Sequence, residues 1–234
     1  MSLPITAITK FTFQDYPKHT ACIIWLGGCS LRCKYCHNPE FITEKYKILD
    51  EQEIWKFLKS RIGLLDAVVL SGGECMLSEQ VIDFITKIKE LGFKVKIDTN
   101  GTRYSKVEHL INNNLIDAIA TDYKAPKEKF TLITDQKIEL YDEFSKTLDL
   151  AILNQDKITL EVRTTVHTDL LNENDINQII QDLDNRNYQG TYYIQNFRND
   201  NKKTLGNLPN QTRILDKSKL IQPKNFQLDF RNFW

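Results

Sequence analysis

Short apolar runs alternate with amphipathic segments along most of the chain. Six apolar runs are expected to be strands: residues 21–26, 67–70, 93–97, 116–121, 158–165 and 191–195. The segments between them repeat apolar residues with the period of a helix, near residues 50–62, 78–92, 105–114, 141–152 and 176–183. Strands separated by helices of this length form right-handed βαβ units, so the pattern predicts an α/β fold with a parallel sheet.

Capping residues mark the ends of two of these helices. Asp50, with Glu53 three residues later, is expected to cap the first helix, and Gly92 to end the second. Repeated strand–helix units suit either an open doubly wound sheet or an incomplete barrel, and the pattern does not choose between them. In both architectures ligands bind at the carboxyl ends of the strands. The functional residues are therefore expected in the segments that follow the strands.

The alternation stops at Phe197. This change divides the chain into a main domain, residues 1–196, and a C-terminal extension, residues 197–234. The extension holds eight Lys and Arg against three Asp and Glu, with aromatic residues near its end. It is interpreted either as a cap over an open barrel edge or as a docking surface for an acidic partner. We favour the cap, because apolar residues recur throughout the extension.

Composition places the chain among ordinary globular proteins. A length of 234 residues suits one sizeable domain, and 41% of the residues are hydrophobic and 26% charged. The net charge is zero, which gives no electrostatic argument for binding nucleic acid or a membrane. The first residues do not resemble a signal peptide, and no run reaches the roughly 18 apolar residues of a membrane helix. A cytoplasmic protein is expected.

Three of the five cysteines lie within eight residues, at Cys29, Cys33 and Cys36. An odd cysteine count in a protein of this kind argues against a disulfide framework. Thiolates are soft ligands that suit iron–sulfur clusters, zinc and copper(I). Three thiolates on a four-iron cluster would leave one iron open to bind a substrate, as the open position of a catalytic zinc does.

Two other metal sites fit parts of this segment. Residues 33–37 match the Cys-x-x-Cys-His pattern of haem attachment, but that interpretation needs an exported protein and leaves Cys29 unexplained. Zinc could be bound by the three cysteines and His37, although His37 adjoins Cys36 and adjacent ligands fit poorly around one tetrahedral ion.

Glycines and charged residues follow the next three expected strands. Gly72, Gly73 and Glu74 end the second strand, where the glycines allow close approach to the backbone and the carboxylate could accept an ammonium group. Asp98 ends the third strand and Asp122, with Lys124, ends the fourth. The two aspartates could share a cation or hold a ribose. Ordinary turns are the alternative interpretation, because Asn-Gly and Ala-Pro, typical turn dipeptides, occur in both of these segments.

Cys-x3-Cys-x2-Cys, with the aromatic Tyr35 before the last cysteine, resembles the signature of the radical S-adenosylmethionine (radical SAM) superfamily. The resemblance implies that Cys29, Cys33 and Cys36 hold a [4Fe–4S] cluster whose fourth iron chelates S-adenosylmethionine. It implies further cofactor contacts, at Tyr35 beside the adenine, at Gly72, Gly73 and Glu74 near the methionyl amine, and at Asp98, Asp122, Lys124 and Arg163. Arg163 could instead be a paired charge inside the barrel. Cys75 stands where family members commonly have proline, and it is interpreted as a free thiol.

Four short segments narrow this resemblance. Cys-His-Asn-Pro-Glu at residues 36–40, Asp-Tyr-Pro at 15–17, Asp-Thr-Asn-Gly at 98–101 and Asp-x-Lys-Ala-Pro at 122–126 are similar to activating enzymes of glycyl-radical proteins. The nearest likeness is to the activator of anaerobic ribonucleoside-triphosphate reductase. It implies a partial (β/α)6 TIM-like barrel, a glycyl-radical enzyme as partner, and a flavodoxin- or ferredoxin-type electron donor. Asp15 and Asn38 would lie where the partner's glycine loop enters. Radical chemistry on a small molecule, nucleic acid or peptide stays open as an alternative.

Overall fold

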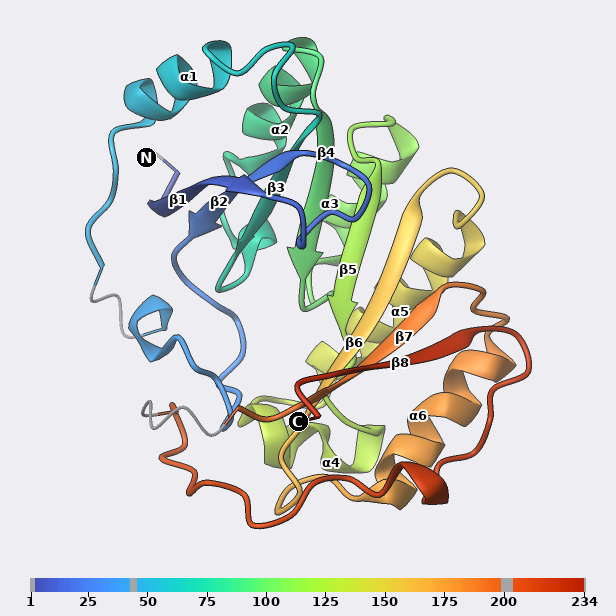
Figure 1. Ribbon diagram of the computed structural model, residues 1–234. Coiled ribbons are helices and arrows are strands. Elements are labelled where there is room, and N and C mark those ends of the chain that lie inside the picture. The colour runs from blue at the N-terminus through green and yellow to red at the C-terminus, as the bar shows by residue number, and fades with distance from the viewer. Residues whose placement is uncertain (1–2, 43–45, 199–203, 234) are drawn as a thin grey trace. The chain divides into compact units, whose positions relative to one another are not determined.

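Strands and helices alternate through most of the computed structural model, which describes residues 3–42, 46–198 and 204–233 (Figure 1). The chain divides into two units, and each is described by itself. The first comprises residues 1–30, 40–99 and 103–119, and the second residues 31–39, 100–102 and 120–234. Strand β5 (Ala118–Asp122) begins in the first and ends in the second.

The first unit is built on four strands, β1 (Ile5–Thr12), β2 (Ala21–Leu26), β3 (Ala67–Gly72) and β4 (Lys94–Thr99). β1 runs antiparallel to β2, whereas β2, β3 and β4 are parallel. Nearly every side chain of β2 and β3 is buried, as expected of parallel strands covered on both faces. The helices of this unit are α1 (Glu51–Lys59), α2 (Val81–Glu90) and α3 (Tyr104–Asn112), with a short 3-10 helix, η2 (Cys75–Leu77).

The second unit is built on the parallel strands β6 (Thr159–Val166), β7 (Thr191–Asn196) and β8 (Gln227–Arg231). Its helices are α4 (Lys127–Thr134), α5 (Glu139–Leu153) and α6 (Glu173–Asn185), and a 3-10 turn, η3 (Lys217–Lys219), precedes β8. The 3-10 turn η1 (Pro39–Phe41) lies where the chain passes between the units.

The expected parallel strands and all five expected helices are confirmed. Asp50 caps α1 as predicted, because its side chain accepts a hydrogen bond from the amide of Gln52 at 2.9 Å. Gly92 follows α2 with a positive φ of 88°, the conformation of a helix stop. The helix expected from residue 78 begins only at Val81, since Glu74 caps the separate 3-10 turn η2 before it.

Besides the short 3-10 turns, two strands and one α-helix were not expected. β1 has few buried side chains, so its sequence lacks the apolar signature of the other strands. α4 is short and follows Pro126 directly. β8 lies in the C-terminal extension and alternates apolar with charged residues, ending at Asp229, Phe230 and Arg231. Because β8 pairs with β7, the described part of the extension adds a strand to the sheet.

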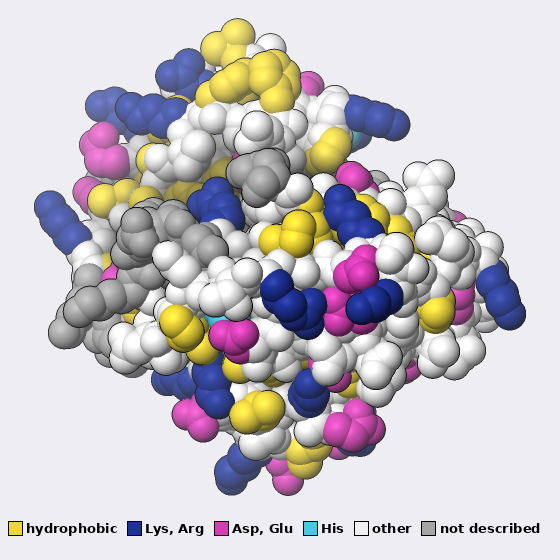
Figure 2. All heavy atoms as spheres, turned by 60° about the horizontal axis from the view of Figure 1, so that its bottom comes forward, with side chains coloured by type: hydrophobic (Ala, Val, Ile, Leu, Met, Phe, Trp, Pro, Cys, Tyr) yellow, Lys and Arg dark blue, Asp and Glu magenta, His cyan; other side chains and the backbone are white. Residues whose placement is uncertain are grey.

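The boundary after residue 196 stays a prediction. Residues 199–203 and Trp234 of the expected extension lie outside the described residues. Within the described ranges no helix is long and apolar enough to cross a membrane. Basic and acidic side chains are interspersed on the face that Figure 2 shows, in keeping with the zero net charge.

Candidate functional site

In the first unit, the glycine turn after β3 packs directly on the backbone that follows β2. The amide of Gly73 donates to the carbonyl of Leu26 at 2.9 Å, and the amide of Glu74 donates to the carbonyl of Gly28 at 2.8 Å. A Cβ at Gly73 would overlap the Gly28 carbonyl oxygen, and one at Gly72 would overlap that of Leu26. Gly72 also has a positive φ of 123°. Only glycines allow this approach, which fixes the strand end beside Cys29.

Glu74 is held with its carboxylate buried. Only 1% of the residue is exposed, and its Oε1 accepts hydrogen bonds from the amide of Met76 at 3.0 Å and from Thr99 Oγ1 at 2.7 Å. Carboxylates have about four acceptor positions. These two bonds therefore orient the carboxylate, and its negative charge suits an ammonium ligand.

Asp98, at the end of β4, is surrounded by polar groups of the same unit. Its Oδ2 accepts from Ser71 Oγ at 3.2 Å, and Lys96 Nζ lies 3.1 Å from its Oδ1. The Cys75 thiol donates to the Asp98 carbonyl at 3.2 Å. Burial, with the charges of Glu74 and Asp98, raises the pKa of Cys75 well above its usual value. The protonated thiol agrees with the interpretation of Cys75 as a free cysteine.

In the second unit, backbone hydrogen bonds hold the loop that carries Cys33 and Cys36. The amides of Arg32 and Lys34 donate to the last carbonyls of α4, at Thr134 (2.8 Å) and Ile133 (3.0 Å). The amide of Cys36 donates to the carbonyl of Cys33 at 2.9 Å. Cys33 is buried and Cys36 is half-buried. The loop is therefore shaped by main-chain contacts.

The predicted cofactor residues of this unit form a network of charges. Lys124 Nζ lies 2.9 Å from Asp122 Oδ2, and Arg163 Nε lies 3.2 Å from Asp122 Oδ1. Burial would raise the pKa of Asp122, but the charges and hydrogen bonds of Lys124 and Arg163 outweigh it and lower that pKa to about 2. Arg163 also lies 3.9 Å from Glu161. Arg163 therefore forms ion pairs with two acidic residues, as the alternative interpretation of this residue as a paired charge requires.

Tyr35 lies beside this network. Lys124 Nζ is 5.9 Å from the centre of the Tyr35 ring, and only 5% of the residue is exposed. Burial raises the pKa of Tyr35 well above its usual value. Among the described residues, the buried hydroxyls of Tyr35 and Thr121 have no hydrogen-bond partner. Buried polar atoms of this kind, in the unit that contributes two thiolates, fit a polar ligand.

The C-terminal extension contacts the cysteine loop within the second unit. The amide of Leu205 donates to the carbonyl of Cys36 at 3.0 Å, and that of Gly206 to the carbonyl of Lys34 at 2.9 Å. The ring of Phe197 stacks on His37 with centroids 4.8 Å apart and meets His167 edge-on at 4.7 Å. His167 is fully buried and donates from Nε2 to a carbonyl of the extension.

The predicted site residues thus fall into two groups, one in each unit. The first unit holds Asp15, Cys29, Gly72, Gly73, Glu74 and Asp98, and the second holds Cys33, Tyr35, Cys36, Asn38, Asp122, Lys124 and Arg163. Asp15 is half-buried and its Oδ2 accepts from Thr12 Oγ1 at 2.6 Å, whereas Asn38 is exposed.

Over the described ranges, no three His, Cys, Asp or Glu side chains are gathered to hold a single metal ion. This finding gives the zinc interpretation no support. It does not test a four-iron cluster, in which each thiolate binds a different iron.

Sequence reasoning missed several contacts of these groups. Lys96 was not selected, although a lysine inside an otherwise apolar strand is a signal of a buried charge. Phe197 was used only to mark where the alternation of strands and helices stops, and His167 was assigned no role. The local sequence does not indicate that residues 205 and 206 bond to the cysteine loop, because the bonded partners are about 170 residues apart in the chain.

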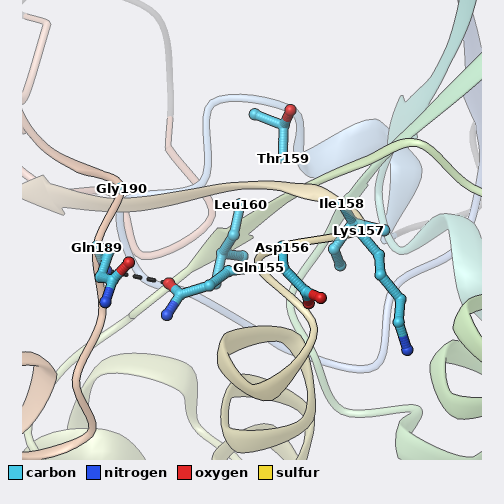
Figure 3. Close-up of a pocket in the computed structure, with 8 residues that line it drawn as sticks. All are labelled: Gln155, Asp156, Lys157, Ile158, Thr159, Leu160, Gln189 and Gly190. Atoms are coloured by element: carbon cyan, nitrogen blue, oxygen red, sulfur yellow. Dashed lines mark hydrogen bonds between the residues drawn. The ribbon is translucent and has the colours of Figure 1, made fainter.

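A hollow of about 370 Å³ lies elsewhere in the second unit (Figure 3). It is lined by Gln155, Asp156, Lys157, Ile158, Thr159, Leu160, Gln189 and Gly190, and Gln155 accepts a hydrogen bond from the amide of Gln189 at 3.1 Å. These residues lie at the amino ends of β6 and β7. Ligands of parallel α/β folds bind at the carboxyl ends, and the hollow contains no predicted site residue.

Gly73→Ala should destabilise the first unit, because its new methyl group must displace the Gly28 carbonyl. We expect a loss of about 2–3 kcal/mol in the free energy of unfolding, measured by chemical denaturation. Gly63→Ala is the control, since a Cβ there meets nothing within 4 Å and has only the cost of a positive φ. An effect at Gly73 no larger than at Gly63 would contradict the close packing.

Asp122→Asn should remove a pH-dependent contribution to stability. The lowered pKa of Asp122 stabilises the fold above the ordinary aspartate pKa of about 4, by about 2 kcal/mol. That contribution should disappear as the pH falls toward about 2. The measurement is the difference in unfolding free energy between the native protein and the variant at pH 7 and pH 3. Asp142→Asn, in an exposed ion pair, should change little at either pH. A difference that is constant with pH would refute the assignment.

Phe197→Leu should loosen the cysteine loop. Without the ring between His37 and His167, the amides of Leu205 and Gly206 should exchange with solvent faster, by about tenfold. Hydrogen exchange measured by mass spectrometry reports this directly. Phe233→Leu, near the other end of the extension, serves as the control and should leave the exchange of residues 205–206 unchanged. Equal exchange in both variants would argue against the stack as a support.

Comparison with known proteins gives the family. A sequence profile of the radical SAM superfamily matches residues 23–183. A protein of Methanocaldococcus jannaschii, provisionally named a glycyl-radical enzyme activating enzyme, is 35% identical over 204 residues, covering 84% of this chain and 81% of that protein. The pyruvate formate-lyase-activating enzyme of Clostridium pasteurianum is 31% identical over 134 residues, which cover 54% of this chain and 56% of the relative.

Solved structures agree on the fold. Methylornithine synthase matches with a TM-score of 0.61 and 14% identity, over 85% of this chain and 59% of that one. SuiB of Streptococcus suis matches with a TM-score of 0.60 and 12% identity, over 88% of this chain and 47% of that one. The chain thus spans about half the length of these two structures. The likeness confirms the expected α/β partial barrel, while the profile match removes the haem and zinc alternatives. The chain belongs to the radical SAM superfamily and is an enzyme of that superfamily, with a [4Fe–4S] cluster and S-adenosylmethionine as its cofactors.

Proposed function

We propose that this chain activates a glycyl-radical enzyme, and that its partner is anaerobic ribonucleoside-triphosphate reductase. The observation that carries the first part is the 35% identity to the Methanocaldococcus jannaschii protein over 81% of its length. Similarity to pyruvate formate-lyase-activating enzyme supports the same class of partner. The reductase is inferred from the segments Cys-His-Asn-Pro-Glu and Asp-x-Lys-Ala-Pro.

In this proposal Cys29, Cys33 and Cys36 hold the cluster. With both cofactors bound, the chemistry supplied is one-electron cleavage of the sulfonium to methionine and a 5′-deoxyadenosyl radical, which takes a hydrogen atom from a glycine Cα of the partner. Gly73 and Glu74 receive the methionyl amine. Tyr35, Gly72, Asp98, Asp122, Lys124 and Arg163 are the further cofactor contacts, and a flavodoxin- or ferredoxin-type protein is the electron donor.

The chain contributes orientation and the exclusion of water. The buried carboxylate of Glu74 is already oriented by Met76 and Thr99, so an ammonium group arriving there meets a fixed acceptor. The charges of Lys124 and Asp122 are paired before any ligand binds. Little reorganisation is then needed, and the binding energy of the cofactor is available for positioning the bond that breaks.

The partner loop would enter near Asp15 and Asn38. Asn38 is exposed and follows the cysteine loop directly, as a contact with an incoming segment requires. Asp15 is half-buried, in the connection between β1 and β2. These two assignments rest on the resemblance to activating enzymes alone.

Electron paramagnetic resonance tests the activation. The reconstituted protein, mixed anaerobically with the reductase, S-adenosylmethionine and a reductant, should produce the doublet of a glycyl radical. Cys33→Ala should abolish both the doublet and the formation of 5′-deoxyadenosine, because it removes a cluster ligand. Cys22→Ala is the matched control, since Cys22 is buried in β2 outside the motif and should retain both signals.

The outcomes separate the parts of the proposal. If 5′-deoxyadenosine accumulates while the reductase gives no doublet, the partner assignment fails and the cofactor chemistry stands. Retained cleavage in Cys33→Ala would contradict the cluster assignment itself.

A further inference from the structure

Lys96 is a buried lysine in the middle of β4. Only 3% of the residue is exposed, although the strand begins at the exposed Lys94. Lys96 and Asp98 are two residues apart, so their side chains lie on the same face of the strand. Their charged groups meet, with Nζ 3.1 Å from Asp98 Oδ1.

The ammonium has a second partner outside β4. It donates to the backbone carbonyl of Asp15 at 2.5 Å, in the connection between β1 and β2. Lys96 therefore joins the end of β4 to this connection, residues 13–20, within the first unit. A buried ammonium is costly unless it is paired and hydrogen-bonded, and these two oxygens provide both.

The two oxygens are also the kind that bind a simple cation. Carboxylate and backbone carbonyl oxygens are the usual ligands of hard cations in proteins. Here both lie next to an ammonium that is covalently part of the chain, which donates a hydrogen bond to the Asp15 carbonyl and forms an ion pair with Asp98 Oδ1. The other carboxylate oxygen, Oδ2, accepts a hydrogen bond from the hydroxyl of Ser71.

We propose that Lys96 is a positioning residue that takes the place of a bound monovalent cation at Asp98. Its ammonium orients the Asp98 carboxylate and ties the connection carrying Asp15 to the cofactor end of β4. The cofactor part of this inference rests on the proposed role of Asp98, and the tether does not. It changes the expectation from sequence, in which the strand-end aspartates could bind a cation.

The inference predicts how binding of S-adenosylmethionine depends on the cation in the buffer, and this prediction is the rule to be tested. Binding of S-adenosylmethionine to the reconstituted protein should be equal in potassium, sodium and tetramethylammonium buffers of the same ionic strength, because the charge at Asp98 is built in. Removing that charge should create a requirement for a small cation.

Lys96→Gln tests the rule. We expect this variant to bind S-adenosylmethionine about tenfold more weakly in tetramethylammonium buffer, with most of the loss restored by potassium, sodium or ammonium ions. Tetramethylammonium is too large to enter the vacated position. Lys94→Gln makes the same chemical change at an exposed position of the same strand and should bind like the native protein in every buffer.

Hydrogen exchange of the full chain, without cluster or S-adenosylmethionine, gives a second readout. The amides of residues 13–20 should exchange faster in Lys96→Gln than in the native protein, and potassium should slow them again; Lys94→Gln is no control here, because Lys94 Nζ lies 3.3 Å from His19 Nε2. Because no cofactor is present, this result stands or falls separately from glycyl-radical activation. Failure of activation with the cation pattern intact would count against the proposed function alone.

Three results would overturn the inference. The first is a native protein whose cofactor binding already depends on potassium or sodium. The second is a Lys96→Gln variant that matches Lys94→Gln in cofactor binding and the native protein in hydrogen exchange. The third is a loss that no small cation restores, which would make Lys96 a packing residue. If Lys96→Gln fails to fold, Lys96→Arg keeps the charge and should remain independent of the cation, and dependence there would also refute the proposal.

Discussion

The close contact between the backbones that follow β2 and β3 determines the geometry of the first unit. Because Gly72 and Gly73 have no side chains, the turn after β3 can donate two hydrogen bonds to the carbonyls of Leu26 and Gly28. Those bonds place Glu74 where its carboxylate caps η2 and receives Thr99. The position of Cys29 is fixed by the same contact, since it follows Gly28 directly. The absence of side chains at Gly72 and Gly73 thus positions both Cys29 and Glu74.

In the second unit, different contacts position the motif residues. Its cysteine loop is held on one side by the last carbonyls of α4 and on the other by the amides of Leu205 and Gly206. Its charged residues are matched among themselves, with Asp122 between Lys124 and Arg163. Pairing of this kind lets several ionised groups remain half-buried without a ligand. Backbone hydrogen bonds and paired charges therefore position the motif residues of the second unit, as the glycine turn does in the first.

Local pattern sufficed for much of this molecule. Apolar runs predicted the parallel strands, and Asp50 and Gly92 predicted helix ends, because each signal acts over a few residues. The motif cysteines and the Gly-Gly-Glu turn were likewise visible in short segments. The pattern did not predict β1 and β8, because these strands have many exposed side chains and so lack the apolar signature. The contacts of Lys96 were not predicted, because they depend on tertiary packing: one partner is the backbone of Asp15, in the connection between β1 and β2.

The contact between the extension and the cysteine loop also has a consequence in time. Residues 34 and 36 are synthesised well before their backbone partners at 206 and 205, which come about 170 residues later. The loop with Cys33 and Cys36 can therefore adopt its packed form only after residue 206 has left the ribosome. Until then the segment with those thiols lacks the two hydrogen bonds that residues 205 and 206 donate to it. The sequence distance between these partners therefore sets the earliest moment at which the packed cysteine loop can form.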